Sequence, residues 1–285
     1  MLILMKNALT IDLEFWYSAE LIRPYVQDAP DLIIEMTIPI LDLLDIHKTK
    51  ATFFVLGEVA EKYPDLISDI YNRGHEIASH AYSHKPLSEL GRVGFENEIY
   101  KSLCLLERIT GDRIKGFRAP TFSINNNTIW GLDVLEKSNF VYDSSIFPIN
   151  SPLYGVPNAP LYPYHPSRSN LALEDELNGF KIIEIPLSVF KTNIINIPIS
   201  GGFYLRSIPF FIFNILFKKS LKSKTNIIYL HPWEIYPISP RPKLPIYSSF
   251  ITYLNIDSTL DKLNGLLNLY KFTTMEEIVE DLSLI

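Results

Sequence analysis

Apolar and polar positions alternate regularly along the first half of the chain. Short apolar runs predict buried β-strands at residues 7–15, 50–57, 75–80, 114–120 and 140–145. Between them, apolar residues recur at helical spacing at residues 31–47, 58–74, 95–111 and 126–139. Two of these helices end on a glycine, Gly74 and Gly111, the residue type expected just past a helix C-terminus. Strands that alternate with helices predict βα units around a parallel sheet.

The alternation stops between about residues 146 and 206. This stretch contains "FPINSPLYGVPNAPLYPYHP", rich in proline and tyrosine, and predicts a structured excursion over one end of the sheet. Further strands and helices are predicted at residues 182–190, 208–220, 225–231, 258–270, 271–275 and 276–282. We therefore expect residues 1–285 to form one α/β domain, a distorted (β/α) barrel of about seven parallel strands. A barrel is favoured over an open sheet because no glycine-rich dinucleotide loop follows a strand.

Composition narrows the class of protein. The chain of 285 residues is 47% hydrophobic and has a formal net charge of −6, so no nucleic-acid partner is expected. The longest apolar stretch, residues 208–217, is shorter than the roughly 20 residues that span a bilayer. The amino terminus has the pattern of a strand rather than of a signal peptide, so we expect a soluble cytoplasmic protein. Cys104 is the only cysteine and is expected to be a small core residue of its helix.

Side chains that can do chemistry stand at the ends of the predicted strands. They are Asp12 and Glu14, His80 and His84, Arg118, Asp143 and Ser144, and His231. Because the carboxyl ends of parallel strands meet at one end of a barrel, these groups are expected to converge there.

The stretch "GHEIASHAYSHKP" holds three of the six histidines of the chain. The spacing of four between His80 and His84 is expected to bring both imidazoles to one face of a helical turn, where they can bind one cation. The alternative is that one of them caps or hydrogen-bonds the loop, but carboxylates at another strand end favour a metal. His75, at the start of its strand, is interpreted as a structural hydrogen-bonding residue.

Asp12 and Glu14 lie two residues apart, on one face of the first strand. Two carboxylates buried together need a cation or an arginine beside them. One can ligate the metal while the other acts as a base toward water. Arg118, in "GFRAP", can orient that base and keep it ionised. The alternatives are an exposed strand edge for the carboxylates and an ordinary surface position for the arginine.

His231 ends a late apolar strand and has no second histidine near it in sequence, which favours a general acid over a metal ligand. A core histidine bonded to the backbone is the alternative. Glu234 is a candidate to orient the imidazole, and Trp233 is a candidate wall for stacking a sugar ring.

The excursion and the fifth predicted strand add further candidates for binding a substrate. Tyr154 and Tyr164 are candidates for stacking against sugar rings. The backbone N–H of Ser144 or its neighbours is a candidate to stabilise an oxyanion.

The chain resembles the polysaccharide deacetylases of the NodB-homology group, carbohydrate esterase family four. The resemblance lies in "LTIDLE", "ATFFVLGEVAEKYPDLISDIYNRGHEIASHAYSHKPL", "GFRAPTFSI", "YDSSIFP" and "LHPWE". Four segments, "YGVPNAPLYPY", "IEIPLSVF", "ISGGFYLR" and "HPWE", further resemble the exopolysaccharide deacetylases found beside PEP-CTERM/exosortase loci. The resemblance implies a TIM-like barrel of about seven strands. It also implies metal-dependent hydrolysis of N-acetyl groups on an amino sugar of a cell-surface or extracellular polysaccharide or its precursor.

The resemblance also implies roles for single residues. His80 and His84 match the metal-binding histidines, whose metal is usually zinc and sometimes cobalt or another divalent ion. Asp12 matches the catalytic base, Arg118 the arginine that holds it, and His231 the catalytic acid.

Two positions depart from the pattern of that family. The second aspartate of its first motif, a metal ligand, is Leu13 here, so Glu14 is our hypothesis for the third ligand. Its Asp-Trp motif is not evident after "YDSS", so Asp143 or Glu234 is the candidate replacement for the aspartate.

Two rival functions stay open at this point. One is a metal-independent amidase of the same fold that acts on a small amide, and the other is a barrel that binds sugar without turning it over. Separate acid and base residues count against pure binding, because a binding site needs neither.

Overall fold

A curled parallel sheet forms the centre of the molecule in the computed structural model, which describes residues 6–151, 154–221, 225–236 and 239–283. On one side of β1 (Asn7–Leu13), the strands follow one another in chain order. They are β2 (Thr52–Val55), β3 (Glu76–Ser79), β4 (Gly116–Phe117), β5 (Tyr142–Asp143) and β6 (Ile183–Glu184). On the other side of β1 lies β9 (Ile227–Leu230), also parallel. This arrangement confirms the predicted α/β barrel of about seven parallel strands.

The barrel is open between its two outer strands. Within the described residues, β6 and β9 do not pair with each other, so the sheet is a half-barrel. An antiparallel pair, β7 (Val189–Lys191) and β8 (Asn196–Pro198), follows β6. The ends of this pair cover the edge of β9, because Ile227 N donates to Ser188 Oγ and Tyr229 N donates to Ser200 O. The short strand β10 (Phe272–Thr273) pairs with the first residues of β1.

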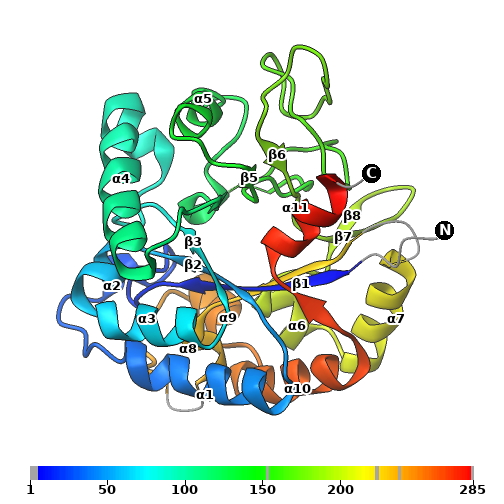
Figure 1. The fold of residues 1–285 in the computed structure, drawn as a ribbon. Helices are drawn as coiled ribbons and strands as arrows, with labels where there is room; N and C mark the ends of the chain where they lie inside the picture. Colours follow the sequence, from blue (N-terminus) through cyan, green and yellow to red (C-terminus); the bar gives the residue numbers. More distant parts are fainter. Residues whose placement is uncertain (1–5, 152–153, 222–224, 237–238, 284–285) are drawn as a thin grey trace.

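Helices surround the sheet in an outer arc (Figure 1). They include α1 (Ile33–Ile46), α2 (Gly57–Lys62), α3 (Pro64–Asn72), α4 (Leu87–Thr110), α5 (Trp130–Lys137), α7 (Phe210–Ser220) and α10 (Thr259–Leu269). Their apolar faces bury a continuous core against the strands. The single helix predicted at 58–74 is wrong in one respect: Pro64 starts a second helix, because proline lacks the N–H that a continuous helix would use.

The second half of the chain is less regular. It adds the short helices α6 (Gly202–Ser207), α8 (Pro232–Ile235) and α9 (Ile246–Tyr253), and ends with α11 (Met275–Ser283). The sequence predicted none of the three short helices α6, α8 and α9. Three-residue 3₁₀ turns lie at Arg23–Tyr25, Pro120–Phe122 and Ile256–Ser258.

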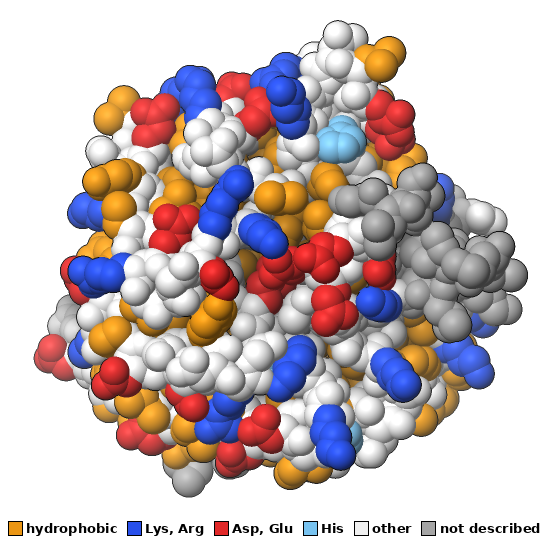
Figure 2. All heavy atoms as spheres, in the orientation of Figure 1, with side chains coloured by type: hydrophobic (Ala, Val, Ile, Leu, Met, Phe, Trp, Pro, Cys, Tyr) orange, Lys and Arg blue, Asp and Glu red, His pale blue; other side chains and the backbone are white. Residues whose placement is uncertain are grey.

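Two surface features bear on the expectations from composition. On the face seen in Figure 2, lysine and arginine side chains are interspersed with acidic ones and form no basic stripe. No helix of the described part is long and apolar enough to cross a membrane. Cys104 is exposed on α4, so the expectation that it lies in the core is wrong; it falls on the outward face of an amphipathic helix.

Candidate active site

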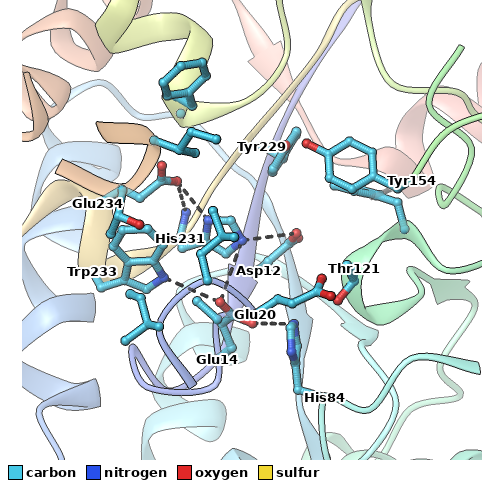
Figure 3. A pocket seen from close by; sticks show the side chains of 18 of the residues that line it. Asp12, Glu14, Glu20, His84, Thr121, Tyr154, Tyr229, His231, Trp233 and Glu234 are labelled. Carbon is cyan, nitrogen blue, oxygen red and sulfur yellow. Dashed lines mark hydrogen bonds and ion pairs between the residues drawn. The ribbon is translucent and has the colours of Figure 1, made fainter. Parts of the chain in front are cut away.

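The carboxyl ends of β1, β3, β4 and β9 meet at one pocket (Figure 3). Its lining includes Asp12, Glu14, His80, His84, His231 and Trp233. Asp12, Glu14, His80 and His231 lie within or directly after a strand, and His84 lies in the loop that follows β3. The curl of the sheet therefore brings residues from far along the chain together. Arg118, directly after β4, does not line the pocket but contacts it through Asp12.

Asp12 is held by a buried arginine. Arg118 is fully buried, and its Nη1 donates to Asp12 Oδ1 at 2.6 Å and to Thr10 Oγ1 at 2.8 Å. Its Nε donates to the backbone oxygen of Ser144 at 3.0 Å, and the guanidinium lies over the ring of Phe54. Such a pair fixes the carboxylate in one orientation and leaves its second oxygen, Oδ2, toward the pocket.

Glu14, His80 and His84 form a buried group whose ligand atoms lie within 4.8 Å of one another. The predicted helical turn is wrong, because residues 80–86 form a loop. Ala81 and His84 adopt positive φ angles of 62° and 56°, and the imidazoles of His80 and His84 lie close together, with ring centroids 5.3 Å apart and planes tilted by 58°. Backbone of this kind is costly for residues other than glycine, so the surrounding structure must hold Ala81 and His84 in place.

The chemistry of this group fits a divalent cation. His80 Nδ1 bonds to the carbonyl oxygen of Arg118 at 2.8 Å and must be the donor there, so its Nε2 keeps a free lone pair. Burial, and then the nearby His84, hold the pKa of His80 well below its usual value, which keeps the ring neutral. Glu14 Oε2 is buried without an aligned hydrogen-bond donor, 2.5 Å from His84 Nε2. Two imidazoles and a carboxylate are a common ligand set for zinc.

The ionised form of Glu14 is favoured by its neighbours. Burial by itself raises the pKa of this carboxyl, but the charges of His84 and His231 outweigh burial and lower the pKa below its usual value. An ionised carboxylate is the form that binds a cation.

His231 lies across the pocket from these residues. Its Nε2 is 4.0 Å from Asp12 Oδ2 and 3.8 Å from Glu14 Oε1. Its Nδ1 bonds to Glu234 Oε2 at 2.8 Å, so Glu234, rather than Asp143, orients the imidazole. Burial by itself lowers the pKa of His231, but Glu14 and the hydrogen bond to Glu234 raise it to about 9. A histidine that is protonated at neutral pH has a proton to give.

Two aromatic candidates lie at the pocket. Trp233 stacks on the ring of His231 with centroids 5.5 Å apart, and its Nε1 donates to Glu14 Oε1 at 3.4 Å. Tyr154 lines the opposite wall (Figure 3). Both positions fit the predicted contact with a substrate ring.

Two predicted substrate contacts are corrected by the structure. Tyr164 is buried outside the pocket lining, where its hydroxyl donates to the carbonyl oxygen of Leu171 at 2.6 Å. Ser144 is also buried; its backbone N donates to the carbonyl oxygen of Phe117, and its Oγ accepts from Arg118 Nη2. The backbone N–H of Ser144, predicted to stabilise an oxyanion, is therefore already bonded to the neighbouring strand. The Ser144 hydroxyl helps to position Arg118.

Other predicted polar residues have structural partners. His75 Nδ1 accepts a hydrogen bond from Ala51 N, as predicted. Asp143 accepts from Ser145 Oγ and lies against Glu184; burial raises the pKa of Asp143 to about 6, and it makes no contact with His231.

The sequence missed several residues at this site. Tyr229 lines the pocket from β9. The sequence could have indicated this, because Tyr229 lies two residues before His231 and alternate residues of an extended chain share a face. Glu20 also lines the pocket from the loop after β1. Arg206, on α6, gave no such signal, because it follows no strand.

Comparison with known families agrees with this geometry. Residues 27–140 match the model "Polysaccharide deacetylase", and residues 144–280 match "Domain of unknown function (DUF3473)". The match to the polysaccharide deacetylases thus covers residues 27–140, which are less than half of the chain. Both matched segments contribute strands to the one sheet: β2, β3 and β4 lie in the first, β6 and β9 lie in the second, and β5 lies between the two segments.

Curated relatives match over part of their length. A peptidoglycan-N-acetylglucosamine deacetylase of Bacillus cereus is 43% identical over 102 residues, which are 36% of this chain and 36% of that protein. A chitooligosaccharide deacetylase of Sinorhizobium fredii is 33% identical over 112 residues, 39% of this chain and 48% of that protein. The chain thus spans about a third to a half of the length of these relatives.

Solved structures show the fold over the whole chain. A polysaccharide deacetylase homologue from Mycobacterium smegmatis has a TM-score of 0.60 at 17% identity, covering 100% of this chain and 92% of that one. An allantoinase has the same TM-score of 0.60 at 16% identity, covering 96% and 88%. Because a polysaccharide deacetylase homologue and an allantoinase are equally similar in fold, the fold by itself leaves the substrate open.

Proposed function

We propose that the protein is a metal-dependent hydrolase that removes N-acetyl groups from an amino sugar of a polysaccharide or its precursor. One observation carries the proposal: a held carboxylate, Asp12, and a held imidazole, His231, flank the buried Glu14–His80–His84 group in one pocket. A base on one side and an acid on the other are what amide hydrolysis requires, because a water must lose a proton and the departing nitrogen must gain one.

Each residue of the pocket then has a defined task. Asp12 Oδ2, left free by the bond of Oδ1 to Arg118, accepts the proton of the attacking water. His231, protonated and oriented through Nδ1 by Glu234, donates its Nε2 proton to the amine nitrogen as the C–N bond breaks. A divalent cation bound by His80, His84 and Glu14 would polarise the acyl carbonyl and favour ionisation of the water. We propose zinc, with cobalt or another divalent ion as substitutes.

The proposed substrate class rests on the pocket walls and on the relatives. Trp233 and Tyr154 offer aromatic surfaces on two sides of the pocket, which suit the apolar face of a sugar ring. Two relatives named above are deacetylases of N-acetylated glycans. The finer assignment, to the exopolysaccharide-associated deacetylases, rests on segments that all lie within residues 144–280. We propose a cell-surface polysaccharide or its cytoplasmic precursor as the substrate.

The test combines metal content with acetate release. Protein purified without chelator should carry about one divalent ion per chain and release acetate from N-acetylglucosamine oligomers. His84→Ala should lose both properties. His47→Ala is the matched control, because His47 bonds to Asn264 outside the pocket, and it should keep both.

Other outcomes would favour the rival functions. Bound metal without acetate release, together with hydrolysis of allantoin or another small amide, would support a small-amide hydrolase, a possibility raised by the allantoinase fold match. Sugar binding without turnover of any amide would support a binding barrel. Turnover that persists after metal is removed would contradict the metal-dependent reaction.

A further inference from the structure

The segment "ISGGFYLR", residues 199–206, packs directly on the residues that orient His231. A Cβ added at Gly201 would lie 2.6 Å from the hydroxyl oxygen of Tyr229. A Cβ added at Gly202 would collide with both carboxylate oxygens of Glu234. Glycine at these positions therefore allows the backbone at the start of α6 to touch the partner of the acid.

Arg206, one turn further along α6, reaches the same carboxylate. Its side chain is 1% exposed, and Nη1 donates to Glu234 Oε1. The other oxygen of Glu234, Oε2, accepts from both the backbone N and Nδ1 of His231. The carboxylate is thus held from two sides, by the arginine on one oxygen and by the histidine on the other.

Arg206 is itself anchored by the end of α9. Nη2 donates to the carbonyl oxygens of Ile251 and Thr252 at 2.6 and 3.1 Å, and Nε donates to Leu254 O at 3.0 Å. The last carbonyl groups of a helix have no partner within the helix and carry partial negative charge, so they suit a guanidinium. The planar guanidinium of Arg206 can donate hydrogen bonds to the carbonyl groups of the helix end and to the carboxylate of Glu234 at the same time, which a lysine ammonium cannot do in this geometry.

We propose that Arg206 is a positioning residue for the general acid, and that it acts by fixing Glu234 so that Nδ1 of His231 keeps its proton and Nε2 points at the reacting centre. This inference rests on the proposed function, and it assigns a role to the segment matched as DUF3473: α6, α8 and α9 together form the holder of the acid.

The arrangement explains why an arginine is needed there. Glu234 is buried, and a buried carboxylate without a cation takes up a proton or turns toward water. Arg206 and His231 outweigh burial and lower the pKa of Glu234 to about 2. The carboxylate therefore stays ionised and available as the acceptor for His231.

The experiment compares two substrates that differ in their need for an acid. Hydrolysis of an N-acetylglucosamine oligomer needs protonation of the leaving nitrogen, whereas 4-nitrophenyl acetate releases a stable phenolate that needs none. In Arg206→Met, kcat on the oligomer should fall about 10- to 100-fold with KM within about twofold, while the ester reaction changes by less than about twofold. Arg206→Lys keeps the charge beside Glu234, should fold normally, and should lose about tenfold on the oligomer only.

Two control variants are measured on the same two substrates, the oligomer and the ester. Asp12→Asn should lower the rate of hydrolysis of both substrates, because both reactions need the base. Arg168→Met removes another arginine of the same segment, bound to Asp133 and Glu136 away from the pocket, and should slow neither. Equal losses on both substrates in the two Arg206 variants, or no loss on the oligomer, would overturn the proposal.

A second measurement tests the positioning role of Arg206 independently of the proposed substrate class. In zinc-loaded protein labelled with ¹⁵N-histidine, the Nδ1–H resonance of His231, assigned with His231→Gln, should be present in the wild type and lost or shifted in Arg206→Met. No acetate release by the wild type would reject the proposed function, and the loss of this resonance would still support the positioning role. An unchanged resonance in Arg206→Met would overturn the positioning role.

Discussion

The two sides of the pocket are each held by a buried arginine–carboxylate pair, but at different distances from the reacting atoms. Arg118 binds Asp12, which itself faces the water, whereas Arg206 binds Glu234, which in turn binds His231. The difference follows from the two tasks. A base acts as an anion, so a cation can hold it directly. An acid acts as a cation, so an anion must hold it, and that buried anion needs a cation of its own.

Glu76 shows what happens to a buried carboxyl group without such a partner. It accepts hydrogen bonds from Thr52, Tyr142 and the backbone N of Glu276, but from no arginine. Burial raises its pKa to about 7, whereas that of Glu234 is about 2. A neighbouring cation therefore decides whether a buried carboxyl group stays ionised at neutral pH: Arg206 and His231 keep Glu234 ionised, and histidines keep Glu14 ionised.

The largest effect is expected from Asp12→Asn, which removes the base but keeps its size. Turnover of an N-acetylated oligomer should fall by about 10²- to 10⁴-fold, the usual contribution of a general base. Acetate release is the measurement, with metal content as the control, because Asp12 is not among the proposed ligands. Activity within about tenfold of the wild type would mean that another group takes the proton.

A smaller loss is expected from Glu234→Gln. The neutral amide no longer supports the charge of His231, whose pKa should fall from about 9. Turnover of the oligomer should fall by about 10- to 100-fold, with little change on an activated ester. If turnover of both substrates falls equally, Glu234 acts on something other than the acid. The comparison between the two arginine–carboxylate pairs would then be wrong.

A third prediction concerns stability and pH at Glu76. Its pKa is higher in the folded protein, about 7, than the ordinary 4.5, so the folded state holds the proton more tightly. The stabilisation is complete below about pH 4.5 and is lost as the pH rises through 7, amounting to about 3 kcal/mol. The free energy of unfolding, measured by denaturant titration for wild type and Glu76→Gln, should show this change in their difference. A difference that stays constant with pH would contradict it.

The smallest effect is expected from Ser144→Ala. The variant loses the hydrogen bond from Arg118 to Oγ and the one from Oγ to the Ile185 carbonyl, which should cost about 1–2 kcal/mol of unfolding free energy. KM should stay unchanged, because Ser144 does not line the pocket. A raised KM with unchanged stability would restore Ser144 as a substrate contact.

Much of the framework could be predicted from sequence because it depends on local pattern. Apolar runs and helical spacing placed β1 to β5, since burial of alternate or periodic positions is a local property. The same reasoning placed Asp12, His80, Arg118 and His231 at strand ends, and a parallel sheet brings strand ends together. The loop geometry of His80 and His84 was not predictable from spacing, because a spacing of four fits a helical turn equally well.

The sequence by itself determined the class of fold, the convergence of Asp12, His80, His84 and His231 on one pocket, and the resemblance to deacetylases. Only the tertiary structure decided that Glu14 joins His80 and His84, that Glu234 rather than Asp143 orients His231, and that Ser144 and Tyr164 have structural partners. It also decided the role proposed for Arg206. The reason is physical: strand ends converge by a rule of topology, but which side chain faces which depends on the packing of loops and short helices from distant parts of the chain.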